Sequence, residues 1–222
     1  MNVSALIPVK SFADAKQRLS PLLNAEERRI LAEAMMRDVL SRVLPAQGLD
    51  ATFVVTADDR VSEIASSLGS KIIREEKERG ETDAVVFALN EMKRRGIEAV
   101  LVIPADLPLL LSSDIEFLLT HVSAPPSALL VPSHDCKGTN ALLLSPPDVI
   151  SLRFGYDSFS FHLSEVAAKG LPLQVLENER IGLDIDEPRD LQRFLSTTTE
   201  GETYTSLVRM GVAEALDRSE GP

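Results

Sequence analysis

Three basic side chains are crowded into nine residues near the N-terminus of this chain. Lys10, Lys16 and Arg18 lie in the segment KSFADAKQR, directly after a short apolar run at residues 3–9. Because the whole chain carries a net charge of −11, such crowding of cations calls for an explanation. The simplest is a ligand with several negative charges, such as a nucleoside triphosphate. A solvated basic loop without a function is the alternative.

Carboxylates follow two other candidate strands. Asp106 lies just beyond the apolar run at residues 99–103, and Asp184 and Asp186 are spaced i, i+2. In an extended segment, residues two apart share a face, so both can approach one cation. Since Mg²⁺ binds through one or two carboxylates plus substrate phosphates, the pattern predicts a Mg²⁺ site at these three residues. The alternatives are a turn or cap at Asp106, and a cap at Asp186 for a helix starting at residues 187–188.

Strand and helix patterns alternate along the chain and must position these residues. The predicted strands are residues 3–9, 51–56, 71–74, 99–103, 128–131 and 141–144, and residues 173–176 and 181–184 are expected to be extended. The predicted helices are residues 25–44, 61–68, 82–95, 112–121, 159–169 and 187–195. The alternation predicts a single-domain α/β protein with a mostly parallel sheet and helices on both faces, and it leaves antiparallel pairing open for the later strands. Such sheets bind ligands outside the carboxyl ends of their strands.

Composition excludes several classes of protein. A chain of 222 residues with 44% apolar content can bury one full core. No apolar run approaches the roughly 18 residues that cross a membrane, and the early strand leaves no room for a signal peptide. The lone Cys136 rules out an internal disulfide and favours the cytoplasm. The acidic balance argues against non-specific nucleic-acid binding, and neither a P-loop nor a GxGxxG motif occurs.

Five motifs together resemble one family. They are PxKx4AKxRL from Pro8, ADLP from Ala105, KGTNAL from Lys137, FGYDSFxxH from Phe154 and GLDIDxP from Gly182. In this order and spacing they resemble the guanylyltransferases of deazaflavin coenzyme biosynthesis, over about residues 3–195. That family includes enzymes acting on 2-phospho-L-lactate and on phosphoenolpyruvate. The related molybdenum-cofactor guanylyltransferases use a glycine-rich loop, whereas this chain has no glycine between Met1 and Gly48.

The resemblance implies a fold, an activity and a site. The implied fold is Rossmann-like and similar to nucleotide-diphospho-sugar transferases. The implied reaction transfers GMP from GTP to the phosphate of 2-phospholactate, phosphoenolpyruvate or 3-phosphoglycerate, releases pyrophosphate and depends on Mg²⁺. The implied nucleotide-binding residues are Pro8, Lys10, Lys16, Arg18, Gly80 and Asp83, and the implied acceptor-binding residues are Thr139, Gly155 and Ser158. The implied catalytic residues are Lys16, Asp106 and Asp186, with metal ligands at Asp106, Asp184 and Asp186.

Several points stay open at this stage. Segment 79–85 departs from the family's pattern because it lacks an expected Asn, although a carboxylate at Asp83 or Glu81 can accept hydrogen bonds from guanine. His162 lies one helical turn after Ser158 and either touches the acceptor or packs in the local core. A different nucleotidyltransferase, of sugar-nucleotide or molybdenum-cofactor type, and a non-catalytic nucleotide-sensing module are the alternative functions.

The expected organisation is a nucleotidyltransferase domain at residues 1–195 and a loosely attached tail at residues 196–222, in which residues 204–216 can form one more helix. The expected partners are GTP and a small phospho-acid, with no nucleic acid and no membrane. A homodimer is left open.

Overall fold

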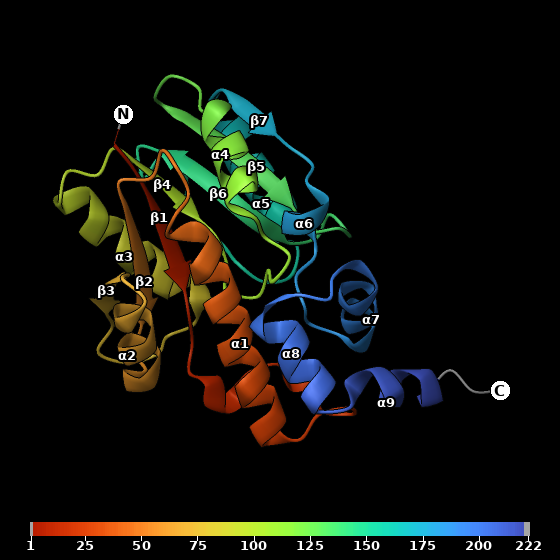
Figure 1. Cartoon of the computed structure of the whole chain (residues 1–222). Helices are drawn as coiled ribbons and strands as arrows, with labels where there is room; N and C mark the ends of the chain where they lie inside the picture. The colour runs from red at the N-terminus through yellow and green to blue at the C-terminus, as the bar shows by residue number, and fades with distance from the viewer. Residues whose placement is uncertain (1, 220–222) are drawn as a thin grey trace.

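A single seven-stranded sheet forms the centre of the molecule in this computed structural model, which describes residues 2–219. Its strands are β1 (Val3–Pro8), β2 (Ala51–Thr56), β3 (Lys71–Arg74), β4 (Ala99–Val102), β5 (Ser127–Pro132), β6 (Thr139–Ser145) and β7 (Leu173–Val175). The α-helices are α1 (Ala25–Val43), α2 (Asp59–Ser67), α3 (Glu81–Arg94), α4 (Ser112–Thr120), α5 (Ser158–Ala168), α6 (Glu179–Gly182), α7 (Pro188–Thr197), α8 (Gly201–Arg209) and α9 (Val212–Ser219). Two 3₁₀ turns, η1 (Phe12–Asp14) and η2 (Gln17–Leu19), shape the loop after β1. Figure 1 shows the arrangement.

The sheet is mostly parallel, as predicted, and its strand order is β3-β2-β1-β4-β6-β5-β7. Strand β1 pairs in parallel with β2 and β4, β2 with β3, and β5 with β7. Only β6, of the strands described, runs against its neighbours β4 and β5. The carboxyl ends of β1 to β4 therefore meet at one edge, where a ligand can contact all four.

Alternating side chains on each strand enter cores on opposite faces of the sheet, because successive strand residues point to opposite sides. On β1, Ala5 and Ile7 pack in the core beneath α1, α2 and α4, whereas Leu6 packs in the core beneath α3 and α5. The strongly apolar β4 lies in the middle of the sheet, as its composition predicts. Both faces are covered, as an α/β sheet requires.

Residues 196–219 are not a loosely attached tail, so that prediction is wrong for them, and residues 220–222 of the predicted tail lie outside the described part. It forms two helices, and Figure 1 shows α8 running beside α1. The Asp38 carboxylate of α1 accepts hydrogen bonds from the backbone N–H groups of Glu202 and Thr203, both at 2.8 Å, and so caps α8. Leu207 and Leu216 are buried in a third core together with residues of α1 and α7.

The segment after β7 also differs from the prediction. Residues 181–184 are expected to be extended, but Ile181 and Gly182 end the short helix α6 (Glu179–Gly182), and the extended backbone begins at Leu183. The side chain of Asn178 accepts from the backbone N–H groups of Arg180 and Ile181 and starts this helix, as Asn favours at an N-cap. Asp184 then follows in the loop between α6 and α7.

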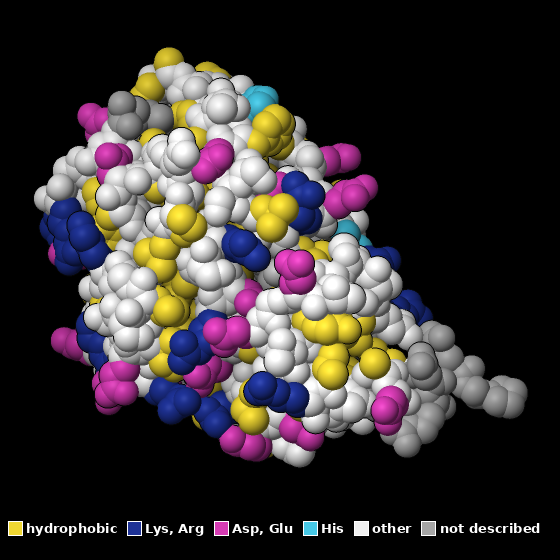
Figure 2. Space-filling model, viewed as in Figure 1, with side chains coloured by type: hydrophobic (Ala, Val, Ile, Leu, Met, Phe, Trp, Pro, Cys, Tyr) yellow, Lys and Arg dark blue, Asp and Glu magenta, His cyan; other side chains and the backbone are white. Residues whose placement is uncertain are grey.

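The surface of the described part mixes charges of both signs. Figure 2 shows Lys and Arg side chains interspersed with Asp and Glu on the face in view. None of the helices within residues 2–219 combines the length and the apolar character that a membrane crossing demands.

Candidate active site

Two cavities adjoin each other at the carboxyl ends of the central strands. The first, of about 490 Å³, is lined by the loop after β1 and by residues following β2, β3 and β4. The second, of about 540 Å³, is lined by the turn between β5 and β6, the loop before α5 and the start of α7. The residues that line both cavities are Arg18, Glu81, Pro104, Asp106 and Asp186. A group transferred between ligands in the two cavities must pass these residues.

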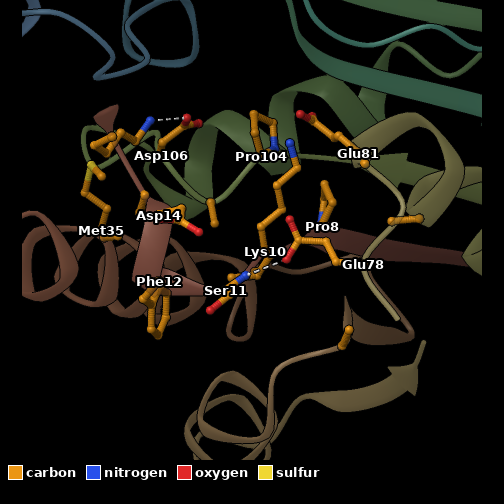
Figure 3. A pocket seen from close by; sticks show the side chains of 18 of the residues that line it. Pro8, Lys10, Ser11, Phe12, Asp14, Met35, Glu78, Glu81, Pro104 and Asp106 are labelled. Atoms are coloured by element: carbon orange, nitrogen blue, oxygen red, sulfur yellow. Dashed lines mark hydrogen bonds and ion pairs between the residues drawn. The ribbon is translucent and has the colours of Figure 1, made fainter. Parts of the chain in front are cut away.

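Lys16 joins the two loops that carry the predicted metal ligands. Its Nζ lies 2.6 Å from Asp106 Oδ2 and 2.8 Å from Asp186 Oδ1 (the pair with Asp106 is drawn in Figure 3). Burial alone would lower the pKa of Lys16, but these two carboxylates raise it above its usual value. The backbone of Lys16 is left-handed, with φ of 51°, which is uncommon for a residue with a side chain. Surrounding structure must therefore hold the loop in place.

Arg28 of α1 supplies that support. The buried guanidinium donates to the backbone oxygens of Ala15 (3.3 Å) and Leu23 (2.8 Å), on either side of Lys16 in the sequence. No motif in the sequence points to Arg28. Its position three residues before Leu31 nevertheless places it on the face of α1 that packs inward, which is unusual for an arginine.

Four carboxylates gather around Lys16. Burial, together with the charge of Asp106, raises the pKa of Asp184 to about 6, although the side-chain amide of Asn140 donates to it at 3.0 Å. Burial and Asp106 also raise the pKa of Glu81. Burial opposes ionisation of Asp186 as well, but Lys16 holds the pKa of that carboxyl below its usual value. Raised pKa values of this kind mark a place where negative charge is incompletely neutralised.

Neither Asp106 nor Asp186 caps a helix, although Asp106 does lie in a turn, as its alternative interpretation predicts. Asp190 accepts the backbone N–H groups of Asp186 (3.0 Å) and Glu187 (2.7 Å), so Asp190 performs the capping of α7. The Asp186 carboxylate is left to pair with Lys16. The Asp106 carboxylate also pairs with Lys16, and its other oxygen, Oδ1, is buried without a hydrogen-bond partner. A buried oxygen of this kind is costly unless a ligand satisfies it.

These residues fit a hard divalent cation. Across residues 2–219, no group of three or more His, Cys, Asp or Glu side chains already stands in an arrangement that could hold a metal ion. Mg²⁺ does not require one, because it usually takes one or two carboxylates and completes its shell with substrate phosphates and water. The unpartnered Asp106 Oδ1 and the all-oxygen character of the donors match that preference.

The predicted nucleotide-binding residues are only partly brought together. Pro8, Lys10 and Gly80 line the first cavity, and in Figure 3 the Lys10 ammonium points toward Pro104 and Glu81. Asp83 is exposed on α3 and lines neither cavity. Glu81, one of the two alternatives for contacting guanine, lies where the cavities meet.

Arg18 is also placed between the cavities. Its guanidinium is mostly exposed and lies 3.7 Å from Asp186 Oδ2 and 3.7 Å from Glu187 Oε1. Exposed pairs at this distance contribute little to stability, so the side chain can move to an anionic ligand at small cost.

The second cavity contains the three residues that the resemblance assigns to the acceptor. Thr139, Gly155 and Ser158 all line it. The backbone N–H of Thr139 donates to Ser158 Oγ at 3.0 Å, and Thr139 Oγ1 lies 2.9 Å from His162 Nδ1. Gly155 has φ of +98°, a conformation that glycine adopts without strain.

The hydrogen bonds of His162 define the direction of the Thr139 hydroxyl. The backbone N–H of Arg153 donates to His162 Nε2 at 3.3 Å, so in the neutral ring Nδ1 carries the proton and donates to Thr139 Oγ1. Ser158 Oγ likewise accepts, from the backbone N–H of Thr139. The hydroxyl hydrogens of Thr139 and Ser158 are therefore both left to donate into the cavity, as an anionic ligand requires. His162 itself is fully buried and lines neither cavity.

Three further basic residues line the second cavity, and the sequence had assigned a binding role to none of them. They are Lys137 in the turn before β6, and Arg189 and Arg193 on α7. Arg189 and Arg193 are spaced i, i+4 and so lie on one face of the helix. That spacing was readable in the sequence, but the direction of the face was not.

We expect His162 to make the protein acid-sensitive. Burial lowers the pKa of His162 from 6.5 to about 4, so its contribution to stability is present above pH 6.5 and is lost as the pH falls through 4. At about 1.4 kcal/mol per pKa unit, the loss approaches about 3 kcal/mol. The measurement is the free energy of unfolding of wild type and His162→Asn at pH 7 and pH 4.5. Thr139→Val, which removes the same hydrogen bond but no titrating group, should keep the wild-type pH dependence. An equally steep decline in His162→Asn would contradict the assignment.

Comparison with known proteins places the chain among guanylyl transferases. Residues 3–221 match the family model "Guanylyl transferase CofC like". The 2-phospho-L-lactate guanylyltransferase of Methanothermobacter thermautotrophicus is 38% identical and covers 99% of this chain and 98% of its own length. The phosphoenolpyruvate guanylyltransferase of Conexibacter woesei is 35% identical, and the match covers 92% of this chain and 94% of that protein. The 3-phospho-D-glycerate guanylyltransferase of Colwellia psychrerythraea is also 35% identical, and the match covers 86% of this chain and 90% of that protein. The match reaches beyond residue 195 into the C-terminal helices, which corrects the predicted extent.

A solved structure shares the fold. The crystal structure of a protein described as a nucleotide-diphospho-sugar transferase from Desulfovibrio desulfuricans G20 has a TM-score of 0.77 and 18% identity, covering 99% of this chain and 98% of that one. The predicted similarity to nucleotide-diphospho-sugar transferases is therefore confirmed at the level of the fold.

Proposed function

This chain belongs to the CofC-like guanylyl transferases, and on that premise we propose that it transfers GMP from GTP to the phosphate of a small phospho-acid. An oxygen of the acceptor phosphate attacks the α-phosphorus of GTP, the bond from that phosphorus to the bridging oxygen of the β-phosphate breaks, and pyrophosphate leaves. The observation that carries the proposal is that two cavities adjoin at Asp106, Asp186 and Arg18. One cavity can hold the nucleotide and the other the acceptor, with the reacting phosphates between them.

No general base is needed for this reaction. A phosphate monoester has its second pKa near 6, so at neutral pH the acceptor is already a dianionic nucleophile. The task of the protein is to bring two anions together in line and to neutralise the leaving group. Lys10, Lys16 and Arg18 supply positive charge on the nucleotide side, while Lys137 and Arg189 supply it on the acceptor side.

We propose that Asp106, Asp184 and Asp186 hold Mg²⁺ when substrate is bound. When bound, Mg²⁺ neutralises phosphate charge and orients the α-phosphate. In the ligand-free arrangement Lys16 pairs with Asp106 and Asp186, and it thereby balances the carboxylates. A cation held by these carboxylates would take over that role, and the Lys16 ammonium would then be available to a phosphate oxygen of the nucleotide.

The acceptor class follows from the second cavity and from the relatives. Thr139 and Ser158 can each donate a hydroxyl hydrogen, and the positive φ of Gly155 lets backbone approach an anion closely. We propose an acceptor with a carboxylate next to its phosphate-bearing carbon. Phosphoenolpyruvate and 2-phospholactate come before 3-phosphoglycerate, because relatives named for the first two match over more of the chain.

The test is to incubate the protein with GTP, Mg²⁺ and each of the three phospho-acids in turn and to identify the product by mass spectrometry. The expected product is the guanylylated phospho-acid together with pyrophosphate, and chelation of Mg²⁺ should abolish it. Product formation from CTP or UTP and a sugar phosphate would instead favour a sugar-nucleotide transferase. Nucleotide binding without any product would favour the sensing module.

Replacing Ser158 by alanine should raise the KM for the acceptor about tenfold to a hundredfold, since one hydrogen bond to a charged group is lost. The KM for GTP should stay nearly unchanged, because Ser158 lines only the second cavity. Steady-state kinetics with each substrate varied separately measures both constants. Ser160→Ala, on the exposed face of the same helix, is the matched control. A change in the KM for GTP instead would exchange the roles assigned to the two cavities.

Three further points stay predictions: a cytoplasmic location, which the lone cysteine favours, the absence of a nucleic-acid partner, and a homodimer as one assembly.

A further inference from the structure

Glu75 is a buried acidic residue on the wall of the first cavity. It directly follows β3, and its backbone N–H donates to the Thr56 oxygen at 3.0 Å. The residue is only 8% exposed and lines the first cavity. Among the described residues, no hydrogen bond or ion pair reaches its carboxylate. Burial and the charge of Glu78 raise the pKa of this carboxyl, and Arg79 offsets them only in part, so its negative charge is incompletely neutralised. A carboxylate of this kind on a cavity wall is well placed to accept hydrogen bonds from a ligand.

The position of Glu75 is at the far end of the cavity from the proposed reaction centre. Asp106 follows β4, and the sheet order β3-β2-β1-β4 places Glu75 three strands away. Neighbouring strands lie about 4.8 Å apart, so the separation across the sheet is about 14 Å. A nucleotide whose α-phosphate lies beside Asp106 can extend its base along the carboxyl ends of β1 and β2 toward Glu75.

The lining of this end of the cavity suits a flat base. Val55 and Ala57 at the end of β2, Pro8 at the end of β1 and Ala84 on α3 are apolar residues that line the same cavity as Glu75. A planar ring can pack against such surface while one edge meets a polar group, the usual design of small-molecule sites. The carboxylate of Glu75 is placed to contact that edge.

The chemistry of the edge identifies the base. An ionised carboxylate offers two acceptors and no donor. Guanine presents two parallel donors, N1–H and the N2 amino group, and can bind both oxygens. Adenine and cytosine present a ring nitrogen acceptor at the matching position, and uracil presents one N–H between two carbonyl oxygens. A carboxylate in this place therefore favours guanine over the other three bases.

We propose that Glu75 selects the base of the donor nucleotide by accepting hydrogen bonds from guanine N1–H and N2–H₂. The proposal rests on the proposed function, because it names the residue that makes the enzyme a guanylyltransferase. It replaces the two carboxylates suggested by the sequence: Asp83 lines neither cavity, and Glu81 lies beside Asp106.

Glu78 provides a matched control. It lines the same cavity and is also acidic, but its carboxylate already accepts the backbone N–H of Ser11 at 3.3 Å, an interaction drawn in Figure 3. Glu78 therefore has a structural partner where Glu75 has none. A general effect of negative charge in the cavity would change the behaviour of both Glu75→Gln and Glu78→Gln. Loss of base recognition would appear in Glu75→Gln alone.

The deciding variant is Glu75→Gln, measured with GTP and with xanthosine triphosphate. The glutamine amide replaces one acceptor by a donor, which opposes the N2 amino group of guanine but matches the carbonyl oxygen that xanthine carries there. We expect kcat/KM for GTP to fall about tenfold to a hundredfold and kcat/KM for xanthosine triphosphate to rise. Wild type, Glu78→Gln and Glu75→Asp should all keep their preference for GTP.

Direct nucleotide binding provides a second readout. Isothermal calorimetry of each variant with the two triphosphates should show the same exchange of preference in Glu75→Gln. A ratio of GTP to xanthosine triphosphate that stays at the wild-type value in Glu75→Gln, at any absolute activity or affinity, would overturn the proposal. Should wild type form no product with any phospho-acid, the proposed function fails, and the binding ratio still decides the role of Glu75.

Discussion

Replacing Asp106 or Asp186 by alanine is expected to lower kcat at least about a hundredfold. That is the scale for loss of a charged group that acts on the transition state. Both carboxylates line both cavities, and Asp106 Oδ1 is buried without a hydrogen-bond partner among the described residues. Steady-state turnover at saturating GTP, acceptor and Mg²⁺ measures the effect.

The control for these variants is Asp148→Ala. Asp148 is a surface carboxylate that pairs with Lys93, and it lines neither cavity. Near-wild-type turnover is expected for it. Thermal unfolding of each variant separates loss of catalysis from loss of fold, since removing one partner leaves Lys16 less well neutralised. If Asp106→Ala or Asp186→Ala is folded and still turns over at the wild-type rate, the replaced residue has no catalytic role.

The second large effect is expected for Lys16→Ala, which should also lower kcat at least about a hundredfold. Lys16 is buried between Asp106 and Asp186, and its left-handed backbone is held from both sides by Arg28. A positive charge in this place would stabilise the negative charge that develops on the reacting phosphates. The measurement is kcat together with the KM for GTP.

Lys71→Ala separates this effect from surface charge. Lys71 lies on β3 over the ring of Phe53, 5.5 Å from its centroid, and lines neither cavity. It carries the same charge, so a general electrostatic attraction for GTP would be reduced equally in both variants. Equal losses would therefore reduce the loop after β1 to a basic surface.

Most of the fold was predictable because its elements have strong local patterns. Strand β2 occupies the predicted residues 51–56, and α1 begins at the predicted residue 25, where Asn24 and Glu27 form a capping box. The errors fall at residues 181–182 and in the C-terminal segment. In both places a short helix starts at a capping side chain. Asn178 caps α6 from the turn directly before it, and Asp38 caps α8 from the distant helix α1.

The site was predictable where it depended on strand ends, because parallel strands bring their carboxyl ends together. It was not predictable where one side chain connects distant segments. Lys16 is 90 residues from Asp106 and 170 from Asp186, and no local pattern indicates that it contacts both. The tautomer of His162 depends on a backbone N–H nine residues away.

The choice between Asp83, Glu81 and Glu75 shows a further limit. Successive side chains on a helix are rotated by about 100°, so two residues that are two positions apart point in nearly opposite directions. One can then face a cavity while the other faces solvent. Because α3 starts at Glu81, that residue faces the cavities and Asp83 faces outward. The burial of Glu75 arises from the packing of several elements and has no signal in the sequence.

The docking of α8 on α1 has a consequence for the order in which the molecule folds. Met35 of α1 lines the first cavity and is buried in the same core as Leu207. The two segments are separated by more than 150 positions, and contacts between such distant segments carry a large cost of loop closure and form slowly. During synthesis, this side of α1 therefore stays uncovered until α8, which is made much later, has also emerged from the ribosome. The wall that α1 contributes to the first cavity is thus completed by a segment far along the chain from α1 itself.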